Sequence, residues 1–255
     1  MKLQDRVAIV TGAATGIGRA CAQRFHDEGA HVVVADIDEA AAGAAAKAIG
    51  PRAEARRLDA MKYAEVEALV QDTAKRHGRL DILVNNVGFS VPGLLKDVTP
   101  EQWDRLIAGN LSTCFYGLKA ALPVMLAARR GAIVNLTSAA GLGGAPMMAP
   151  YGAAKAGVIS LTQSAAVEHA KSGVRVNCVA PGPTATDSLK AWLATLPGGR
   201  AEYEKTLASG RFIEPEEIAA GVFFLASDEA SMVNGVVLRV DGSATAKVAN
   251  MESPE

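Results

Sequence analysis

Short apolar runs alternate with longer segments along most of this chain. Each run spans three to six residues, and most are rich in valine, isoleucine and leucine. Runs of this length and composition are typical of strands that are buried on both faces of a sheet. The predicted strands are Val7–Val10, His31–Ala35, Arg56–Leu58, Asp81–Val84, Ile133–Leu136, Val174–Val179 and Val236–Val240.

The segments between these runs have the spacing of apolar residues that is expected of amphipathic helices. The predicted helices are 19–28, 39–49, 64–76, 101–129, 151–170 and 215–226. This regular alternation predicts a mostly parallel sheet with helices on both faces, a doubly wound α/β fold of the Rossmann type. We expect residues 1–255 to form a single dinucleotide-binding domain.

Residues 184–211, called the lid from here on, depart from this alternation. Leu189, Trp192, Leu193 and Leu196 are mixed there with Pro197, Gly198 and Gly199. Irregular insertions of this length usually serve function. We expect the lid to close over a substrate and exclude water.

The composition narrows the classes of function. Among 255 residues, 49% are hydrophobic and the formal net charge is -1, without a basic block, which argues against a nucleic-acid partner. Cys21, Cys114 and Cys178 are far apart, and the four histidines have no metal-ligand spacing, so neither disulfides nor a metal site are expected. Charges near the N-terminus and the lack of a membrane-length apolar run predict a cytoplasmic protein that binds no membrane.

A glycine-rich turn follows the first predicted strand and precedes the first predicted helix. Gly12, Gly16 and Gly18 lie in this turn, which is the context of a phosphate-binding loop, although their spacing differs from G-x-G-x-x-G. Asp36 ends the second strand about twenty residues later, where a carboxylate accepts hydrogen bonds from an adenosine ribose. Asp38 is the better candidate for the cap of the following helix.

Tyr151 and Lys155 are four residues apart on a predicted helix and therefore share one face. A nearby ammonium group favours the phenolate, so Lys155 is expected to lower the pKa of Tyr151 and to make it useful as an acid and base. Ser138 follows the fifth predicted strand and is placed to hold the same substrate oxygen. The spacing alone is also compatible with a half-buried aromatic beside a solvated charge.

The chemistry-bearing residues occur in a fixed order along the chain. The order is Thr11-Gly12-x-x-x-Gly16-Ile17-Gly18, Asp59, Asn85-Asn86-x-Gly88, Asn110, Ser138, Tyr151-x-x-x-Lys155 and Pro181-Gly182. This ordered set resembles the short-chain dehydrogenase/reductase family from Val7 to Gly242. The residues alone leave open whether Asn85 and Asn86 are purely structural, and whether Asn110 faces water or makes a local contact.

The resemblance implies roles for these positions. Tyr151 would be the acid and base, Ser138 would hold the reacting oxygen, and Asn110 would support a water-linked proton relay to Lys155. Lys155 would also bind the nicotinamide ribose. The implied cofactor contacts are Gly12, Thr15, Gly16, Ile17, Gly18, Asp36, Ile37, Asp59, Ala60, Asn86, Val87, Gly88, Tyr151, Lys155, Pro181, Gly182, Thr184 and Thr186. Val87, Ala60, Thr184 and Ser243 differ from the residues usual in the family, and Val87 bears on the fit of the cofactor.

The resemblance predicts an NAD-dependent enzyme that interconverts a secondary alcohol and its ketone by hydride transfer. Asp36 favours NAD over NADP, because a carboxylate repels a 2′-phosphate, and neither Thr15 nor Ile37 supplies a positive charge. A 3-oxoacyl thioester reductase, an enoyl reductase or dehydratase-like variant, and a non-catalytic nucleotide sensor remain alternatives. The intact Asn110, Ser138, Tyr151 and Lys155 set argues against a sensor.

Apolar residues around Ser138, after Gly88 and in the lid predict an uncharged or weakly polar small-molecule substrate. They are Ala139, Ala140, Leu142, Pro146, Met147, Met148, Phe89, Val91, Pro92, Leu189, Trp192, Leu193 and Leu196, and Leu142 and Leu189 are equally well explained as core. Between Gly152 and Val167 only Lys155 is charged, which predicts a helix buried on two sides, in a homotetramer or under the lid.

Overall fold

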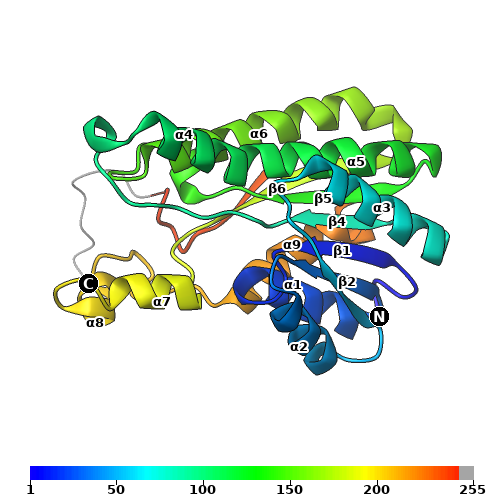
Figure 1. Cartoon of the computed structure of the whole chain (residues 1–255), viewed down its shortest axis with the longest axis horizontal. Helices are drawn as coiled ribbons and strands as arrows, with labels where there is room; N and C mark the ends of the chain where they lie inside the picture. The colour runs from blue at the N-terminus through cyan, green and yellow to red at the C-terminus, as the bar shows by residue number, and fades with distance from the viewer. Residues whose placement is uncertain (247–255) are drawn as a thin grey trace.

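The computed structural model describes residues 1–246 of the chain, which contain one seven-stranded sheet (Figure 1). Every neighbouring pair of strands is parallel, in the order β3-β2-β1-β4-β5-β6-β7. The strands are β1 (Val7–Thr11), β2 (His31–Asp36), β3 (Ala53–Arg57), β4 (Ile82–Asn85), β5 (Gly131–Leu136), β6 (Val174–Pro181) and β7 (Val237–Val240). The predicted doubly wound α/β fold is confirmed.

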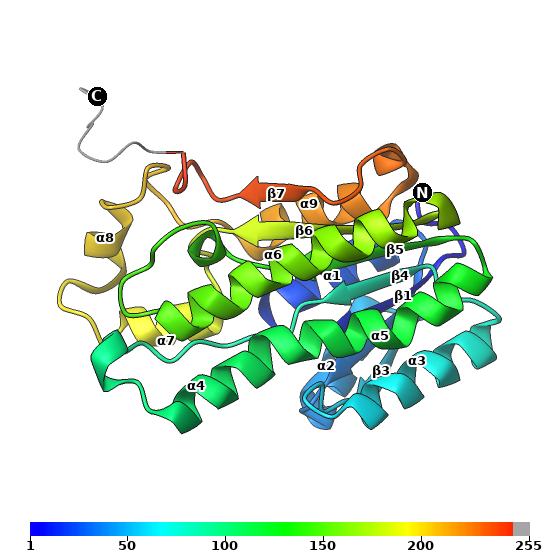
Figure 2. The ribbon, with the colours of Figure 1, turned by 90° about the horizontal axis from the view of Figure 1, so that it is seen from above.

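Helices cover both faces of the sheet (Figures 1 and 2). One face packs against α1 (Gly16–Asp27), α2 (Glu39–Ile49) and α9 (Pro215–Ala226). The other face packs against α3 (Tyr63–His77), α5 (Thr113–Ala127) and α6 (Ala149–His169), and α4 (Pro100–Ile107) lies beside α6. The sheet is therefore the middle of three layers, with an apolar core on each side.

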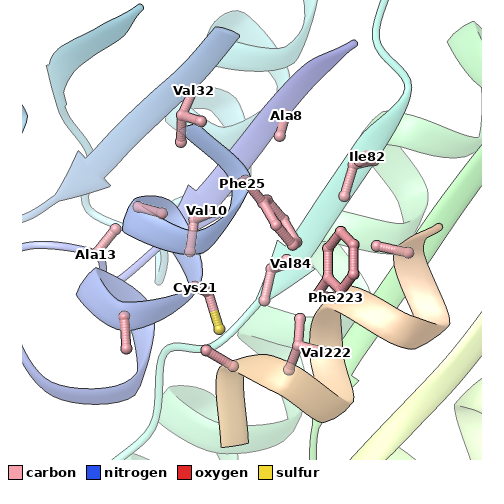
Figure 3. Close-up of a cluster of buried hydrophobic side chains, with 14 of the residues drawn as sticks. Ala8, Val10, Ala13, Cys21, Phe25, Val32, Ile82, Val84, Val222 and Phe223 are labelled. Atoms are coloured by element: carbon pink, nitrogen blue, oxygen red, sulfur yellow. The ribbon is translucent and has the colours of Figure 1, made fainter. Parts of the chain in front are cut away.

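Phe25 anchors α1 to the core on the α1/α9 side (Figure 3). Its ring is fully buried and lies close to Val84 of β4 and Phe223 of α9. The guanidinium of Arg24 lies 4.1 Å from the centre of the Phe223 ring, on the rim of the same contact. Burial of an aromatic side chain contributes roughly 1.5–3 kcal/mol, so this packing fixes the C-terminal half of α1 against the sheet and α9.

Three predicted elements differ most from those observed. The third strand runs from Ala53 to Arg57 instead of 56–58, because the edge of the sheet pairs it with β2 although it has no β-branched residues. Helix α1 begins at Gly16, three residues before the predicted start. The predicted helix 101–129 is interrupted by one π-helical turn, Ala108–Ser112, which carries Asn110.

The lid contains two short helices, α7 (Asp187–Leu193) and α8 (Gly199–Glu204), where the sequence predicted an irregular segment. It encloses a small apolar cluster of its own, formed by Ala185, Leu193 and Phe212 with Leu189, Trp192, Leu196, Tyr203 and Leu207. Most of the apolar lid residues expected to line a substrate pocket, including the almost fully buried Leu193, therefore pack inside the lid.

Backbone pairing closes the base of the lid. The amide of Ala185 donates to the carbonyl of Ile213 at 2.8 Å, and the amide of Ile213 donates to the carbonyl of Pro183 at 3.0 Å. Both ends of the segment are thereby held together beside the carboxyl end of β6. Across residues 1–246, no helix is long and apolar enough to cross a bilayer.

Candidate active site

The order of the sheet reverses between β1 and β4, so the loops that follow these two strands diverge. Such a switch point leaves a crevice at the carboxyl ends of the strands, where doubly wound folds bind ligands. Asn86 ties the two sides of this crevice together, since its Nδ2 donates to the carbonyls of Thr11 and Gly12, both at 3.0 Å. Asn86 thus has at least the structural role that its position suggested.

The glycine-rich loop is shaped for close approach of a ligand to its backbone. Gly12 and Gly16 have φ of 61° and 55°, a conformation that favours glycine. A Cβ at Gly18 would collide with the carbonyl of Gly12, so only glycine fits there. The first turn of α1 has no side-chain cap, which leaves its amides available for a pyrophosphate. These features fit the phosphates of a dinucleotide.

Asp36 lies at the end of β2 and faces this loop. Its Oδ2 accepts from the amide of Ala14 at 3.0 Å and its Oδ1 from the amide of Asp38 at 3.2 Å. Each carboxylate oxygen keeps a further lone pair for a ribose hydroxyl. The side chain of Asp38 accepts from Ala41 and caps α2, as the sequence predicted.

The remaining residues expected near the adenine and the loop lie around the same crevice. Asp59 is half-buried at the turn before α3, where its Oδ1 accepts from the amide of Met61 at 3.0 Å. Ala60 is buried, while Ile37 and Thr15 are exposed. The side chain of Val87 lies against Gly12: its Cγ2 is 3.3 Å from the place of a Cβ on that glycine. One methyl group of Val87 therefore contacts the phosphate-binding loop.

The residues predicted on the nicotinamide side follow β6 into the lid. Pro181 is buried at the end of β6, and the Oγ1 of Thr184 donates to the carbonyl of Gly182 at 2.9 Å. The side chain of Thr186 caps α7, and its Cγ2 is 3.2 Å from the place of a Cβ on Gly16. The beginning of the lid thus touches the phosphate-binding loop.

Lys155 is anchored to the end of β5. Its Nζ donates to the carbonyl of Leu136 at 2.9 Å, and its own carbonyl accepts from the Oγ1 of Thr137 at 2.7 Å. The side chain is only 3% exposed. Burial disfavours the charged form and lowers the pKa of Lys155 from 10.5 to about 8.

Ser138 and Tyr151 face each other across a close contact between the loop after β5 and helix α6. Gly141 and Gly152 permit this contact, because a Cβ on either would lie 2.8 Å from backbone atoms of the other segment. Burial raises the pKa of Tyr151 above 10.0, while the neighbouring Ser138 hydroxyl lowers it. The expectation that Lys155 lowers this pKa is wrong for this structure. The Nζ of Lys155 is turned to Leu136, 5.6 Å from the Tyr151 ring centre, and desolvation prevails.

Asn110 is buried inside the π-helical turn and makes the local contact that was one of its two expected roles. Its Oδ1 accepts from the amide of Phe89 at 3.1 Å, and its Nδ2 donates to the carbonyls of Phe89 and Leu106 at 2.8 and 2.9 Å. A Cβ at Gly88 would lie 2.6 Å from this Oδ1 and 2.9 Å from the Nζ of Lys155. Asn110 and Lys155 therefore meet at Gly88.

Comparisons with known proteins agree with this geometry. A family model described as enoyl-(acyl carrier protein) reductase matches residues 12–245. Meso-2,3-butanediol dehydrogenase of Serratia marcescens is 39% identical over 96% of this chain and 97% of its own length. The chain belongs to the short-chain dehydrogenase/reductase family. As a member, it is an oxidoreductase of alcohols or ketones, in a family whose cofactors are NAD(H) and NADP(H).

Two further relatives show the range of this dehydrogenase/reductase family. The 3-oxoacyl-[acyl-carrier-protein] reductase of Chlamydia muridarum is 38% identical over 94% of this chain and 97% of its own length. The crystal structure of levodione reductase has a TM-score of 0.92 at 33% identity, and the similarity covers 96% of this chain and 100% of that one. Family membership therefore fixes the reaction class and leaves the substrate open.

Sequence reasoning missed several residues at the site of this dehydrogenase/reductase. Thr137 and the carbonyl of Leu136 hold Lys155, and a threonine at the end of an apolar strand was the available signal. The two loops beside the site are also joined, since the amide of Gly93 donates to the carbonyl of Met147 at 2.8 Å. Met147 has a φ of 63°, a left-handed conformation that the sequence does not indicate.

Proposed function

We propose that this protein is an NAD-dependent oxidoreductase that interconverts an uncharged secondary alcohol and its ketone. The observation that carries the proposal is the convergence of Ser138, Tyr151 and Lys155 beside the crevice that fits a dinucleotide. When bound, the nicotinamide cofactor supplies the hydride chemistry. The chain's own residues then have to orient the substrate and move one proton.

Tyr151 is the group that exchanges this proton with the substrate oxygen. Its raised pKa keeps it protonated at neutral pH, so the phenol donates to the oxygen of a ketone during reduction. In the opposite direction the deprotonated Tyr151 oxygen accepts the proton of the alcohol. Ser138 holds the substrate oxygen, and Lys155, with its pKa of about 8, is able to exchange a proton near neutral pH.

The choice of NAD rests on Asp36. Two backbone amides fix its carboxylate at the end of β2, at 3.0 and 3.2 Å. A fixed carboxylate accepts hydrogen bonds from ribose hydroxyls and repels a 2′-phosphate. Arg57 pairs with Asp36 in the sheet register, but its guanidinium is bound to Glu65 at 3.0 Å. This cation therefore has a partner of its own.

An uncharged substrate is favoured because three basic side chains near the substrate loops, Lys96, Lys190 and Arg200, are already paired with carboxylates. Lys190 lies 3.3 Å from Asp187, and Arg200 lies 2.8 Å from Glu204. Lys96 lies 3.0 Å from Asp97. An anionic substrate would have to compete with these carboxylates. The apolar and half-buried residues after Ser138 remain as walls for a mostly hydrocarbon molecule.

Reduction of a 3-oxoacyl thioester is the second candidate. The 38% identity to the reductase of Chlamydia muridarum favours it, whereas the fixed carboxylate of Asp36 favours the cofactor NAD. A comparison of kcat/KM for neutral alcohols and ketones with kcat/KM for acyl thioesters decides between the two candidates. A clear preference for thioesters would overturn the proposed substrate class.

The catalytic assignment is tested by Tyr151→Phe, which removes one hydroxyl and keeps the ring. We expect turnover to fall by roughly 10²–10⁴-fold while cofactor binding stays within about twofold. Tyr63→Phe is the matched control, since the Tyr63 hydroxyl only donates to Glu67 on the surface. Activity of Tyr151→Phe within a few-fold of the unchanged protein would refute the proposed mechanism.

We also propose a homotetramer in the cytoplasm. Cys21, Cys114 and Cys178 are free and buried, which suits a reducing compartment.

The assembly is suggested by exposed apolar side chains beside α6. Trp103 of α4 and Phe115 of α5 are 41% and 43% exposed there, and large exposed apolar side chains suit contact with a second copy. Light scattering at micromolar concentration measures the assembly, and a monomeric mass would refute it.

A further inference from the structure

Three consecutive residues hold helix α6 in place: the last two residues of β5 and Thr137, which follows the strand. Asn135 donates through Nδ2 to the Oγ1 of Thr162 at 2.9 Å. The carbonyl of Leu136 accepts from Lys155, and the hydroxyl of Thr137 donates to the carbonyl of the same lysine. The next residue along the chain is Ser138. The end of β5 therefore presents the substrate-binding hydroxyl directly after three anchors of the helix that carries Tyr151.

Of these three anchors, Asn135 is the one that binds neither Lys155 nor any other group of the proposed reaction. It is fully buried next to the last residue of an otherwise apolar strand, and Thr162 is fully buried as well. The Oδ1 of Asn135 accepts from the Nδ2 of Asn85 at 2.8 Å, and the hydroxyl of Thr162 donates to the carbonyl of Val158 at 2.8 Å. A hydrogen-bonded chain thus crosses from β4 through β5 to α6.

This row of hydrogen bonds restricts where α6 can lie along the sheet. A buried amide without a partner costs about 1–3 kcal/mol, so positions of the helix that separate Thr162 from Asn135 are disfavoured. One residue of helix rises about 1.5 Å, and displacement of a catalytic group by about 1 Å is able to cost 10²-fold in rate. The observed axial position of α6 gives the Nδ2 of Asn135 its acceptor, Thr162, and at the same time lets the Nζ of Lys155 donate to the carbonyl of Leu136.

We propose that Asn135 and Thr162 are positioning residues for catalysis, which act by fixing the axial position of α6 and therefore that of Tyr151 and Lys155 relative to Ser138. Neither residue touches the crevice; both act through the helix. The inference rests on the proposed role of Tyr151. It adds that the geometry of the acid–base pair depends on a hydroxyl about two helical turns beyond Lys155 and about three beyond Tyr151.

The test is Thr162→Val, which keeps the shape of the side chain and removes the hydroxyl. We expect kcat to fall at least fivefold. The solvent deuterium isotope effect on kcat should rise and the pH profile of kcat should shift, because both depend on the geometry of proton transfer. Thr162→Ser keeps the hydroxyl and should restore kcat to within twofold.

Thr73→Val is the matched control, because Thr73 is equally buried and its Oγ1 has no hydrogen-bond partner among the described residues. It should leave kcat, the isotope effect and the pH profile unchanged. Where Thr162→Val does not accumulate as folded protein, Thr162→Ala removes the same hydroxyl and should give the same pattern of constants.

Two outcomes separate this inference from the proposed function. A folded Thr162→Val or Thr162→Ala variant with kcat, isotope effect and pH profile unchanged overturns the positioning role, while Tyr151→Phe still tests the function. A lower kcat with an unchanged isotope effect and pH profile would mean a smaller fraction of active protein, and it also overturns the inference.

Discussion

Asn110 holds the main chain of Phe89 by both ends of its carboxamide, since its Oδ1 accepts from the amide at 3.1 Å and its Nδ2 donates to the carbonyl at 2.8 Å. The side chain that closes this contact lies in a π-helical turn, which bulges toward the loop after β4. Gly88 is thereby held between Asn110 and Lys155, with no room for a side chain at its Cα.

Gly88→Ala should therefore disrupt the site without disrupting the fold. The added methyl group would lie 2.6 Å from the Oδ1 of Asn110 and 2.9 Å from the Nζ of Lys155, so both side chains have to move. We expect kcat/KM to fall by about 10²-fold, in line with displacement of a catalytic group by about 1 Å. Steady-state kinetics measure the loss. Gly93→Ala in the same loop meets no atom within 4 Å and should keep activity within twofold.

Asp36→Ala should relax the choice of cofactor. Removal of the carboxylate removes acceptors for the ribose hydroxyls and the repulsion of a 2′-phosphate, so the ratio of kcat/KM for NAD to that for NADP should fall at least tenfold. The neighbouring Asp38→Ala removes the cap of α2, which costs about 1 kcal/mol of stability, and should leave this ratio unchanged. A higher kcat/KM with NADP in the unchanged protein would contradict the role of Asp36.

The two directions of the reaction should respond differently to pH. Burial raises the pKa of Tyr151, so the phenol stays protonated across neutral pH and reduction should be nearly constant from pH 6 to 8. Oxidation needs the deprotonated form, which becomes more populated as pH approaches that pKa, so its rate should increase between pH 7 and 9. Profiles of kcat/KM in both directions provide the measurement. Faster oxidation at pH 6 than at pH 9 would contradict the assignment.

Lys155→Met should inactivate the enzyme and yet stabilise it at neutral pH. The folded pKa of Lys155 is about 8 and the unfolded value 10.5, so the unfolded chain binds more protons between these values and the stability of the unchanged protein rises with pH there. The advantage of methionine in the free energy of unfolding should therefore be larger at pH 7 than at pH 10 by about 2–3 kcal/mol.

Urea unfolding at the two pH values measures this difference. Lys47→Met is the control, because Lys47 is exposed on α2 and should show no such dependence on pH. An advantage of Lys155→Met that is equal at both pH values would show that the buried ammonium carries no such penalty.

The apolar runs predicted the sheet because burial on both faces leaves a strong signal in sequences such as Val7–Val10 and Ile133–Leu136. The predicted bounds of the edge strand β3 were three residues too late at its start. An edge strand pairs with only one neighbour and tolerates Ala, Glu and Arg, so its sequence lacks the apolar signal. The chain order of motifs indicated Tyr151, Lys155, Ser138 and Asn110 as one set. Their roles in catalysis remain predictions that the variants above test.

Other properties of the site depend on contacts that one sequence does not reveal. The bond between Asn135 and Thr162 joins residues 27 positions apart, and only the packing of α6 on β5 brings them together. The direction of the Tyr151 pKa shift was wrong for the same reason. Proximity along a helix was visible in the sequence, whereas burial and the turn of Lys155 toward Leu136 are tertiary properties.

The lid has a core of its own around Leu193 and Phe212, and its two ends are paired at Ala185 and Ile213. Such a segment packs mainly on its own residues and is joined to the rest of the fold at its base. We expect that its internal residues can be replaced together with little effect on the sheet, provided that Thr184 and Thr186, which lie against Gly182 and Gly16, are kept. Selection for a new substrate is thereby separated from selection for folding.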